Sequence, residues 1–192
     1  IGMLGTADMV GTVFDALDGL GLPIVLDPVM VAKSGDRLLQ TEAVAALRDS
    51  LCRAAVITPN LPEAADLLGQ SEAVSAPEME AQARALMALG AKAVMLKGGH
   101  LAGRECPDLV ATAQGITWLH GTRHATAKTH GTGCTLSSAL ATQLGHGQPL
   151  IAAASAAKAY VARAIATADA LTVGKGHGPT HHFHAAFEGT TA

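Results

Sequence analysis

Apolar positions along the chain alternate between short continuous runs and helical spacing. The runs at 24–26, 54–57 and 93–96 are apolar throughout, which is typical of strands buried on both faces of a parallel sheet. Between them, apolar residues recur three or four positions apart, as on one face of a helix. This alternation of strands and helices predicts an α/β fold with helices on both faces of a mostly parallel sheet.

Helical spacing and breaker residues also predict where each helix lies. The expected helices cover 6–20, 41–51, 62–68, 75–90, a segment from the glycine turn at 131–134 to about 144, and a long segment from 149 to about 165. Ser75 and Glu78 fit a capping box at the start of the fourth. Two further runs, 108–113 and 116–119, predict an antiparallel pair at a sheet edge. No linker or change of composition interrupts the pattern, so we expect one domain over 1–192.

The chain opens on the apolar segment 1–5 and has no initiator methionine. Such a segment is typical of the end of a buried strand, and no charged stretch precedes it as in a signal peptide. We therefore expect a fragment whose upstream strands lie outside this sequence. The alternative is a trimmed or naturally short N-terminus.

Composition excludes several classes of function. Of the 192 residues, 49% are hydrophobic and 15% charged, so the chain is able to bury a core and is not generally disordered. No apolar run approaches ~20 residues, so we expect no membrane-spanning helix. The net charge of −3, the absence of a basic stripe and 3% aromatic residues argue against nucleic-acid and membrane partners. Cys52, Cys106 and Cys134 are too few and too irregularly spaced for a disulfide framework or a zinc finger, which favours a cytoplasmic protein.

Chemically useful side chains follow the predicted strands. Ligands of open α/β sheets bind beyond the carboxyl ends of the strands. At these ends the sequence has Asp27, Asn60 and Lys97, and a glycine-rich turn at 131–134 precedes a helix. An acid, an amide, an ammonium group and an anion-binding turn are therefore expected at one edge of the sheet.

The turn Gly131-Thr132-Gly133-Cys134 is the sharpest of these features. Its glycines allow a tight turn that aims backbone N–H groups at one point, and the helix behind it adds its positive end, so a phosphate is favoured there. The same field favours a reactive Cys134. A glycine-rich loop with an inert Cys134 explains the local pattern equally well. The turn is neither a Walker A loop nor a dinucleotide fingerprint, because their further residues are missing.

Each polar residue also has a simpler interpretation. Asn60 and Glu63 are spaced to face a phosphate–magnesium site, but a helix cap explains them better when they are taken alone. Lys97 either reaches a phosphate or is solvated. Lys158, in mid-helix, either extends to water or carries its charge to a phosphate. Asp27 is either a turn residue or a group that orients magnesium or a proton donor.

Four of the nine histidines cluster near the C-terminus, at His177, His181, His182 and His184. No Glu or Cys completes a metal-ligand set beside them. We therefore interpret them as structural or loop residues.

Seven segments together resemble the hydroxymethylpyrimidine/phosphomethylpyrimidine kinases of thiamin biosynthesis, in the ribokinase-like superfamily. The resemblance covers essentially the whole chain, and its DPVM and GTGCT stretches are specific in combination. The segments are 1–4 (IGML), 25–39 (VLDPVMVAKSGDRLL), 57–68 (ITPNLPEAADLL), 95–101 (MLKGGHL), 129–138 (THGTGCTLSS), 157–165 (AKAYVARAI) and 176–183 (GHGPTHHF).

The resemblance implies a three-layer α/β/α fold, with a mostly parallel sheet that lacks its N-terminal strands, and a kinase that uses ATP and Mg²⁺. It implies these roles: ATP binding by Lys97, Asn60, Thr129 and Lys158; metal binding by Glu63; an anion hole at Gly131 and Gly133; proton acceptance by Cys134; and substrate binding by Met3, Val29 and Asp27. The expected partners are a small pyrimidine substrate and a second copy of the chain.

Two alternatives stay open at this point. One is a pyridoxal or pyridoxine kinase of the same superfamily. The other is a pyrimidine-sensing module without catalysis, although such a sensor has no need of Asn60, Glu63, Lys97 and Cys134 together.

Overall fold

The chain divides into two units, Ile1–Thr122 and Arg123–Ala192, and each is described by itself. The structure, a computed structural model, describes residues 1–30, 39–174, 176 and 178–186. Residues 31–38 of the DPVM stretch, and His177, lie outside the described residues. That both units form a single kinase domain stays a prediction.

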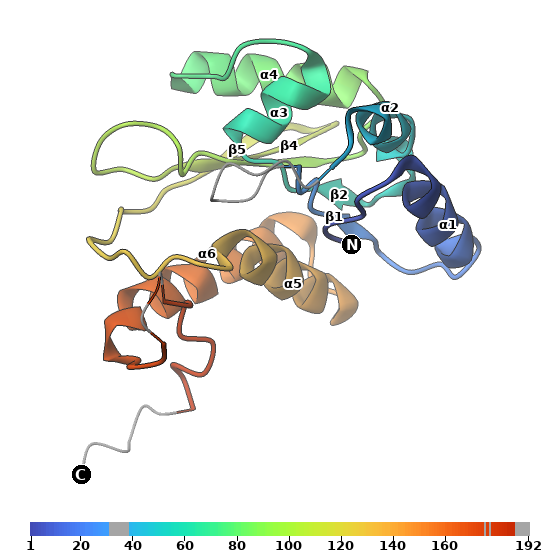
Figure 1. Ribbon diagram of the computed structural model, residues 1–192. Coiled ribbons are helices and arrows are strands. Elements are labelled where there is room, and N and C mark those ends of the chain that lie inside the picture. The colour runs from blue at the N-terminus through green and yellow to red at the C-terminus, as the bar shows by residue number, and fades with distance from the viewer. Residues whose placement is uncertain (31–38, 175, 177, 187–192) are drawn as a thin grey trace. The chain divides into compact units, whose positions relative to one another are not determined.

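A five-stranded sheet forms the centre of the first unit (Figure 1). In order across the sheet its strands are β1 (Val25–Leu26), β2 (Val56–Ile57), β3 (Val94–Lys97), β4 (Asp108–Thr112) and β5 (Gly115–Leu119). β1, β2 and β3 pair in parallel, whereas β3 with β4 and β4 with β5 pair antiparallel. The α/β class and the edge hairpin are confirmed, and the described sheet is mixed.

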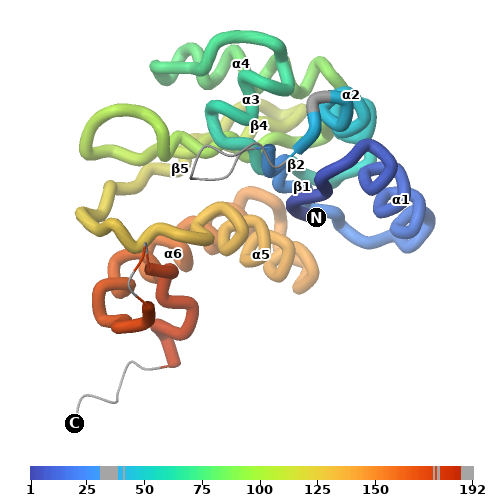
Figure 2. Tube along the Cα trace, viewed as in Figure 1, coloured from blue at the N-terminus to red at the C-terminus, as the bar shows by residue number. Residues whose placement is uncertain are grey.

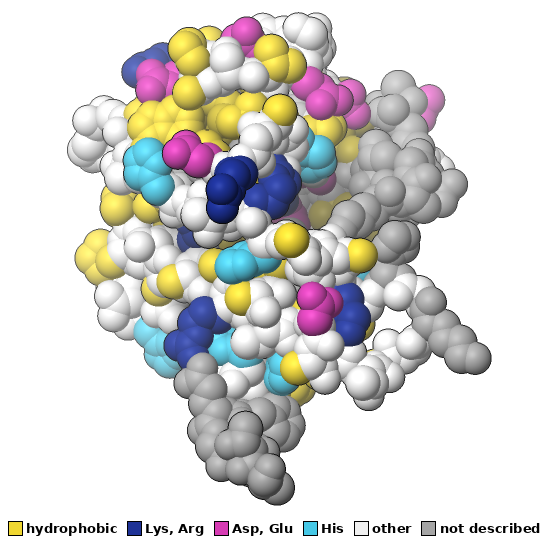
Figure 3. Space-filling view, turned by 90° about the vertical axis from the view of Figure 1, so that its left-hand side faces the viewer, with side chains coloured by type: hydrophobic (Ala, Val, Ile, Leu, Met, Phe, Trp, Pro, Cys, Tyr) yellow, Lys and Arg dark blue, Asp and Glu magenta, His cyan; other side chains and the backbone are white. Residues whose placement is uncertain are grey.

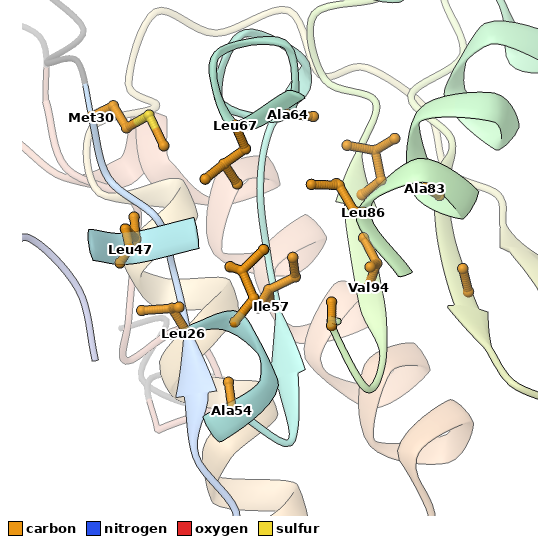
Figure 4. Packing of buried hydrophobic residues seen from close by; sticks show 14 of the residues in the cluster. Leu26, Met30, Leu47, Ala54, Ile57, Ala64, Leu67, Ala83, Leu86 and Val94 are labelled. Carbon is orange, nitrogen blue, oxygen red and sulfur yellow. The ribbon is translucent and has the colours of Figure 1, made fainter. Parts of the chain in front are cut away.

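The helices of this unit are α1 (Ala7–Leu17), α2 (Thr41–Asp49), α3 (Leu61–Leu68) and α4 (Ala76–Ala88), with a 3₁₀ turn, η1, at Leu51–Arg53. Because β1, β2 and β3 are parallel neighbours in chain order, right-handed crossovers place α2, α3 and α4 on the same face (Figure 1). Figure 4 shows their apolar side chains packed with those of the strands, among them Leu47, Leu67 and Leu86 around Ile57.

The capping box expected at Ser75 does not form. Ser75 is the N-cap of α4, but its side chain makes no capping hydrogen bond. The carboxylate of Glu78 instead accepts the backbone N–H of Val74, one residue earlier, at 2.8 Å. Ser75 is the N-cap and Glu78 lies three residues later, as expected, but the carboxylate reaches past the Ser75 N–H to that of Val74.

The strand character expected at the N-terminus is present at Ile1. Its amino group donates to the carbonyl of Val25 at 2.8 Å, and its carbonyl accepts the N–H of Asp27 at 2.9 Å. This is the hydrogen-bond pattern of a parallel neighbour of β1.

The second unit consists of two packed helices and the segments that join them. α5 (Thr132–Gly145) and α6 (Leu150–Ala166) lie side by side, and η2 (Ala168–Ala170) follows (Figure 2). The chain then returns to both helices: Thr180 N donates to His130 O at 3.3 Å, and His181 N donates to Ala164 O at 2.8 Å. These bonds link the turn in front of α5 to the end of α6.

By length and apolar composition alone, one segment of the described chain, Leu150–Ala170, is able to cross a membrane. The segment comprises α6 and η2, and the charged residues Lys158 and Arg163 lie within α6. A single helix of this kind is weak evidence for a membrane span, because core helices of soluble proteins have the same composition.

Gly98 allows the chain to turn at the end of β3. A Cβ atom there would lie 1.9 Å from the carbonyl oxygen of Pro107, while the Gly98 N–H donates to Asp108 Oδ1 at 2.9 Å. We expect Gly98→Ala to lower the free energy of unfolding by about 1–3 kcal/mol or more, since backbone has to move. Urea denaturation measures this.

The matched control is Gly99→Ala, whose Cβ would meet only the sulfur of Cys106, at 3.8 Å. Equal stability of the two variants would show that the close approach at Gly98 is relieved without cost.

Candidate functional site

Side chains from three neighbouring strands meet at one edge of the sheet. Asp27 directly follows β1, Asn60 lies between β2 and α3, and Lys97 is the last residue of β3. The N–H of Lys97 donates to Pro59 O at 2.9 Å, which continues the parallel pairing beyond β2. The structure therefore brings together the acid, the amide and the ammonium group that the sequence placed at strand ends.

The ammonium group of Lys97 lies between two carboxylates. Its Nζ is 2.8 Å from Asp27 Oδ1 and 3.7 Å from Glu63 Oε2. The side chains of Asp27 and Glu63 are only 3% and 7% exposed, and that of Lys97 is 14% exposed. With both carboxylates ionised, the cluster is one negative charge in excess, which favours a further cation.

Asn60 and Glu63 form a complete capping box at the start of α3. Asn60 Oδ1 accepts the N–H of Glu63 at 2.8 Å, and Glu63 Oε2 accepts the N–H of Asn60 at 2.7 Å. The simpler interpretation, a helix cap, is thus confirmed. It does not conflict with a ligand role, because Glu63 Oε1 takes part in neither bond.

Burial raises the pKa of the Glu63 carboxyl from its ordinary value of 4.5 to about 7. The positive charge of Lys97 and the hydrogen bond from the Asn60 backbone both lower this pKa, and the charge of Asp27 raises it. The loss of hydration is the largest of these effects, so near neutral pH this carboxyl lies close to the midpoint of its titration.

Thr58 belongs to the same cluster, although it is not among the residues predicted above. Its hydroxyl donates to Asp27 Oδ1 at 3.1 Å, and the residue is fully buried. A signal was present, because Thr58 is the first polar residue after the apolar run 54–57 and so lies at a strand end.

The glycine turn has the expected place at the start of α5. Gly131 is the N-cap residue and adopts the left-handed conformation with a φ of 80°, which suits glycine. Thr132 Oγ1 donates to Thr129 O at 2.7 Å and thereby ties the turn to the segment before it. Gly133 and an exposed Cys134 lie in the first helical turn, whose N–H groups have no partner within the helix. This geometry suits an anion.

The remaining predicted residues lie in several segments. Lys158 is half-buried on α6 in the second unit. In the first unit, Met3 follows the paired Ile1 and is 60% exposed, and the half-buried Val29 donates its N–H to Asp27 O at 2.8 Å. Met3 and Val29 lie two residues beyond Ile1 and Asp27, which hydrogen-bond to each other as parallel neighbours.

Within the part of the chain that the structure describes, no group of three or more His, Cys, Asp or Glu side chains is arranged to hold a metal ion by itself. His181 and His184 are buried, and the ring of His184 lies 5.0 Å from that of Tyr160. Their packing agrees with the structural interpretation of the C-terminal histidines.

The raised pKa of Glu63 makes stability depend on pH. The folded protein holds this proton more tightly than the unfolded chain, so the stabilisation is present below about pH 4.5 and is lost as the pH rises towards 7. We expect Glu63→Gln to remove this loss, which amounts to roughly 2–3 kcal/mol. Urea denaturation across this pH range measures it.

Glu78→Gln is the matched control, since Glu78 also lies in the first turn of its helix and accepts a backbone N–H, but is exposed. If Glu63→Gln leaves the slope of stability against pH as it is in the parent protein, the Glu63 carboxyl is ionised throughout.

Sequence comparison identifies relatives over nearly the whole chain. A model of the phosphomethylpyrimidine kinase family matches residues 1–181. The hydroxymethylpyrimidine/phosphomethylpyrimidine kinase of Rhizobium meliloti is 50% identical over 96% of this chain, and that of Salmonella typhimurium is 48% identical over 96%. The chain spans 70% of the length of each.

Solved structures show the same fold. A Bacillus subtilis pyridoxal kinase in complex with ADP is 33% identical and superposes with a TM-score of 0.86, covering 96% of this chain and 69% of that one. A phosphomethylpyrimidine kinase from Clostridium difficile is 31% identical, with a TM-score of 0.72 over 86% of this chain and 67% of that one. The fold is therefore ribokinase-like α/β, and the chain belongs to the phosphomethylpyrimidine kinase family.

Proposed function

We propose that this chain transfers phosphate from ATP to the hydroxymethyl group of 4-amino-5-hydroxymethyl-2-methylpyrimidine, and then to the resulting monophosphate, in thiamin biosynthesis. The 50% identity to the R. meliloti kinase over 96% of the chain is the observation that carries the proposal. The charged cluster at the strand ends supports it, because phosphoryl transfer depends on positioning and on neutralising negative charge.

The residues of the cluster fit a magnesium ion. Mg²⁺ takes oxygen ligands and usually binds one or two carboxylates together with substrate phosphates and waters, so three protein ligands are not needed. Asp27 and Glu63 supply two buried carboxylates, and the cluster has one excess negative charge when Glu63 is ionised. Glu63 would hold Mg²⁺, with Asp27 beside it. When bound, the ion neutralises charge on the phosphates.

The remaining contacts to the phosphates follow the same electrostatic argument. We assign phosphate binding to the ammonium groups of Lys97 and Lys158, and we also assign ATP binding to Asn60 and Thr129. The N–H groups that follow Gly131 and Gly133 stabilise negative charge on the transferred group. Cys134 accepts the proton of the hydroxymethyl group. Met3 and Val29 contact the pyrimidine ring, and Asp27 completes this side of the site.

We further propose a cytoplasmic homodimer whose ligands are small molecules rather than nucleic acids. In support, the Lys and Arg side chains on the face shown in Figure 3 lie in small groups, with acidic and histidine side chains near them, and form no continuous basic surface there. Sedimentation velocity measures the oligomeric state.

A coupled assay of ADP release with three ring substrates tests the proposed function. We expect turnover with the hydroxymethylpyrimidine and with its monophosphate, at a kcat/KM at least about tenfold above that for pyridoxal. Pyridoxal is included because several structural relatives are pyridoxal kinases. A preference for pyridoxal would favour a pyridoxal kinase, and ATP binding without turnover would favour a pyrimidine-sensing module without catalysis.

The two phosphorylation steps place different demands on Cys134. The alcohol must lose a proton, whereas a phosphate monoester near neutral pH already presents an ionised oxygen, since its second pKa is about 6. We therefore expect Cys134→Ala to slow the first step by about 10²–10⁴-fold and to change the second much less, with ATP affinity retained. Single-turnover assays of each step measure this.

Cys52→Ala is the control, since Cys52 is also exposed but lies in η1 of the first unit. We expect Cys134→Asp to recover part of the first step, because a carboxylate accepts the same proton. Equal losses in both steps, accompanied by loss of ATP binding, would make Cys134 a structural part of the anion site.

A further inference from the structure

One carboxylate oxygen at the strand ends accepts two hydrogen bonds. Asp27 Oδ1 receives the Thr58 hydroxyl at 3.1 Å and the Lys97 ammonium group at 2.8 Å. The three residues stand at the carboxyl ends of β1, β2 and β3, and the Thr58 N–H also donates to Leu26 O at 2.9 Å. Donors from two strands thus converge on an acceptor from the third.

Burial gives this arrangement its importance. Asp27 is 2% exposed and Thr58 is 0% exposed, so water does not supply the hydrogen bonds that the carboxylate needs. A buried ion pair is favourable only when further hydrogen bonds satisfy the remaining lone pairs and N–H groups of the two ions. The Thr58 hydroxyl provides such a bond and restricts the orientation of the Asp27 carboxylate. Because Lys97 binds the same oxygen, the position of its ammonium group depends on that orientation.

We propose that Thr58 is a positioning residue that acts through Asp27 to hold the Lys97 ammonium group where it meets the phosphates of ATP. This inference rests on the ATP-binding role of Lys97 in the proposed function. Thr58 itself is too deeply buried to contact the nucleotide. Its effect on ATP therefore requires Lys97, whereas a contribution to folding alone does not.

Thr58→Val tests this inference, since it removes the hydroxyl and keeps the shape of the side chain. We expect ATP affinity, measured by calorimetry with Mg²⁺ present, to fall about tenfold, because a hydrogen bond to a charged group is lost. The KM for the pyrimidine should stay within twofold. Thr58→Ser, which keeps the hydroxyl, should restore ATP affinity to within about twofold of the parent protein.

The matched control is Thr112→Val at the end of β4, where the lost hydroxyl bonds only to nearby backbone in an exposed turn. ATP affinity should not change in this variant. Should Thr58→Val fail to fold, Thr58→Ala removes the hydroxyl together with the γ-methyl group, and its comparison with Thr58→Ser, which lacks the same methyl group, isolates the hydroxyl.

A double-mutant cycle separates positioning from general stability. In a Lys97→Ala background, replacing Thr58 should have no further effect on ATP affinity, since the group that it positions is gone. An unchanged affinity of Thr58→Val in the parent protein, or an equal loss in both backgrounds, would overturn the inference. This readout needs no turnover. If the parent protein fails to phosphorylate the pyrimidine but shows the predicted cycle, the proposed function fails and the inference stands.

Discussion

The shared contact of Lys97 with Asp27 and Glu63 is the interaction on which the rest of the site depends. Burying three charges is costly unless each is paired, and removing one partner typically costs about 3–5 kcal/mol. The pairing requires the ends of β1 and β3 and the first turn of α3 to lie within a few ångströms of each other. The parallel order of β1, β2 and β3 meets this requirement, and the Asn60–Glu63 capping box fixes the third participant.

The cluster also suggests a reason for the presence of Glu63, since Asn60 alone is able to cap the start of α3. An Asn cap satisfies a helix start without an acidic residue three positions later. Glu63 adds a carboxyl group that burial makes difficult to ionise, and its pKa is raised accordingly. Such a group is poorly suited to stability at neutral pH but well suited to a cation, whose charge offsets the loss of hydration. The place of Glu63 beside Lys97 and Asp27 is therefore consistent with the cation-binding role proposed for it.

Much of the fold and part of the site follow from the sequence. Apolar runs located β1, β2 and β3. Asp27 and Lys97 directly follow two of these runs, and Asn60 lies three residues beyond the run of β2. Contacts that depend on three-dimensional approach were not predictable. The spacing of Ser75 and Glu78 does not reveal which backbone N–H the carboxylate reaches, and no pattern at Gly98 shows that Pro107 O lies where its Cβ would be. The place of Thr58 at a strand end likewise does not reveal that its hydroxyl donates to Asp27.

The likeness to two kinds of kinase separates what the fold supplies from what selects the substrate. Pyridoxal kinases superpose on this chain with TM-scores up to 0.87, although their sequence identity is near 30%, whereas relatives named for the pyrimidine reach 50%. Both reactions require the same handling of ATP phosphates, so groups that serve the phosphates do not distinguish the rings. Selection between them therefore depends on side chains at the ring. In this chain the candidates are Met3, exposed after Ile1, and Val29, half-buried two residues after Asp27. Met3 and Val29 are uncharged, so shape and apolar contact at these two positions, together with the substrate role proposed for Asp27, are expected to decide which ring is accepted.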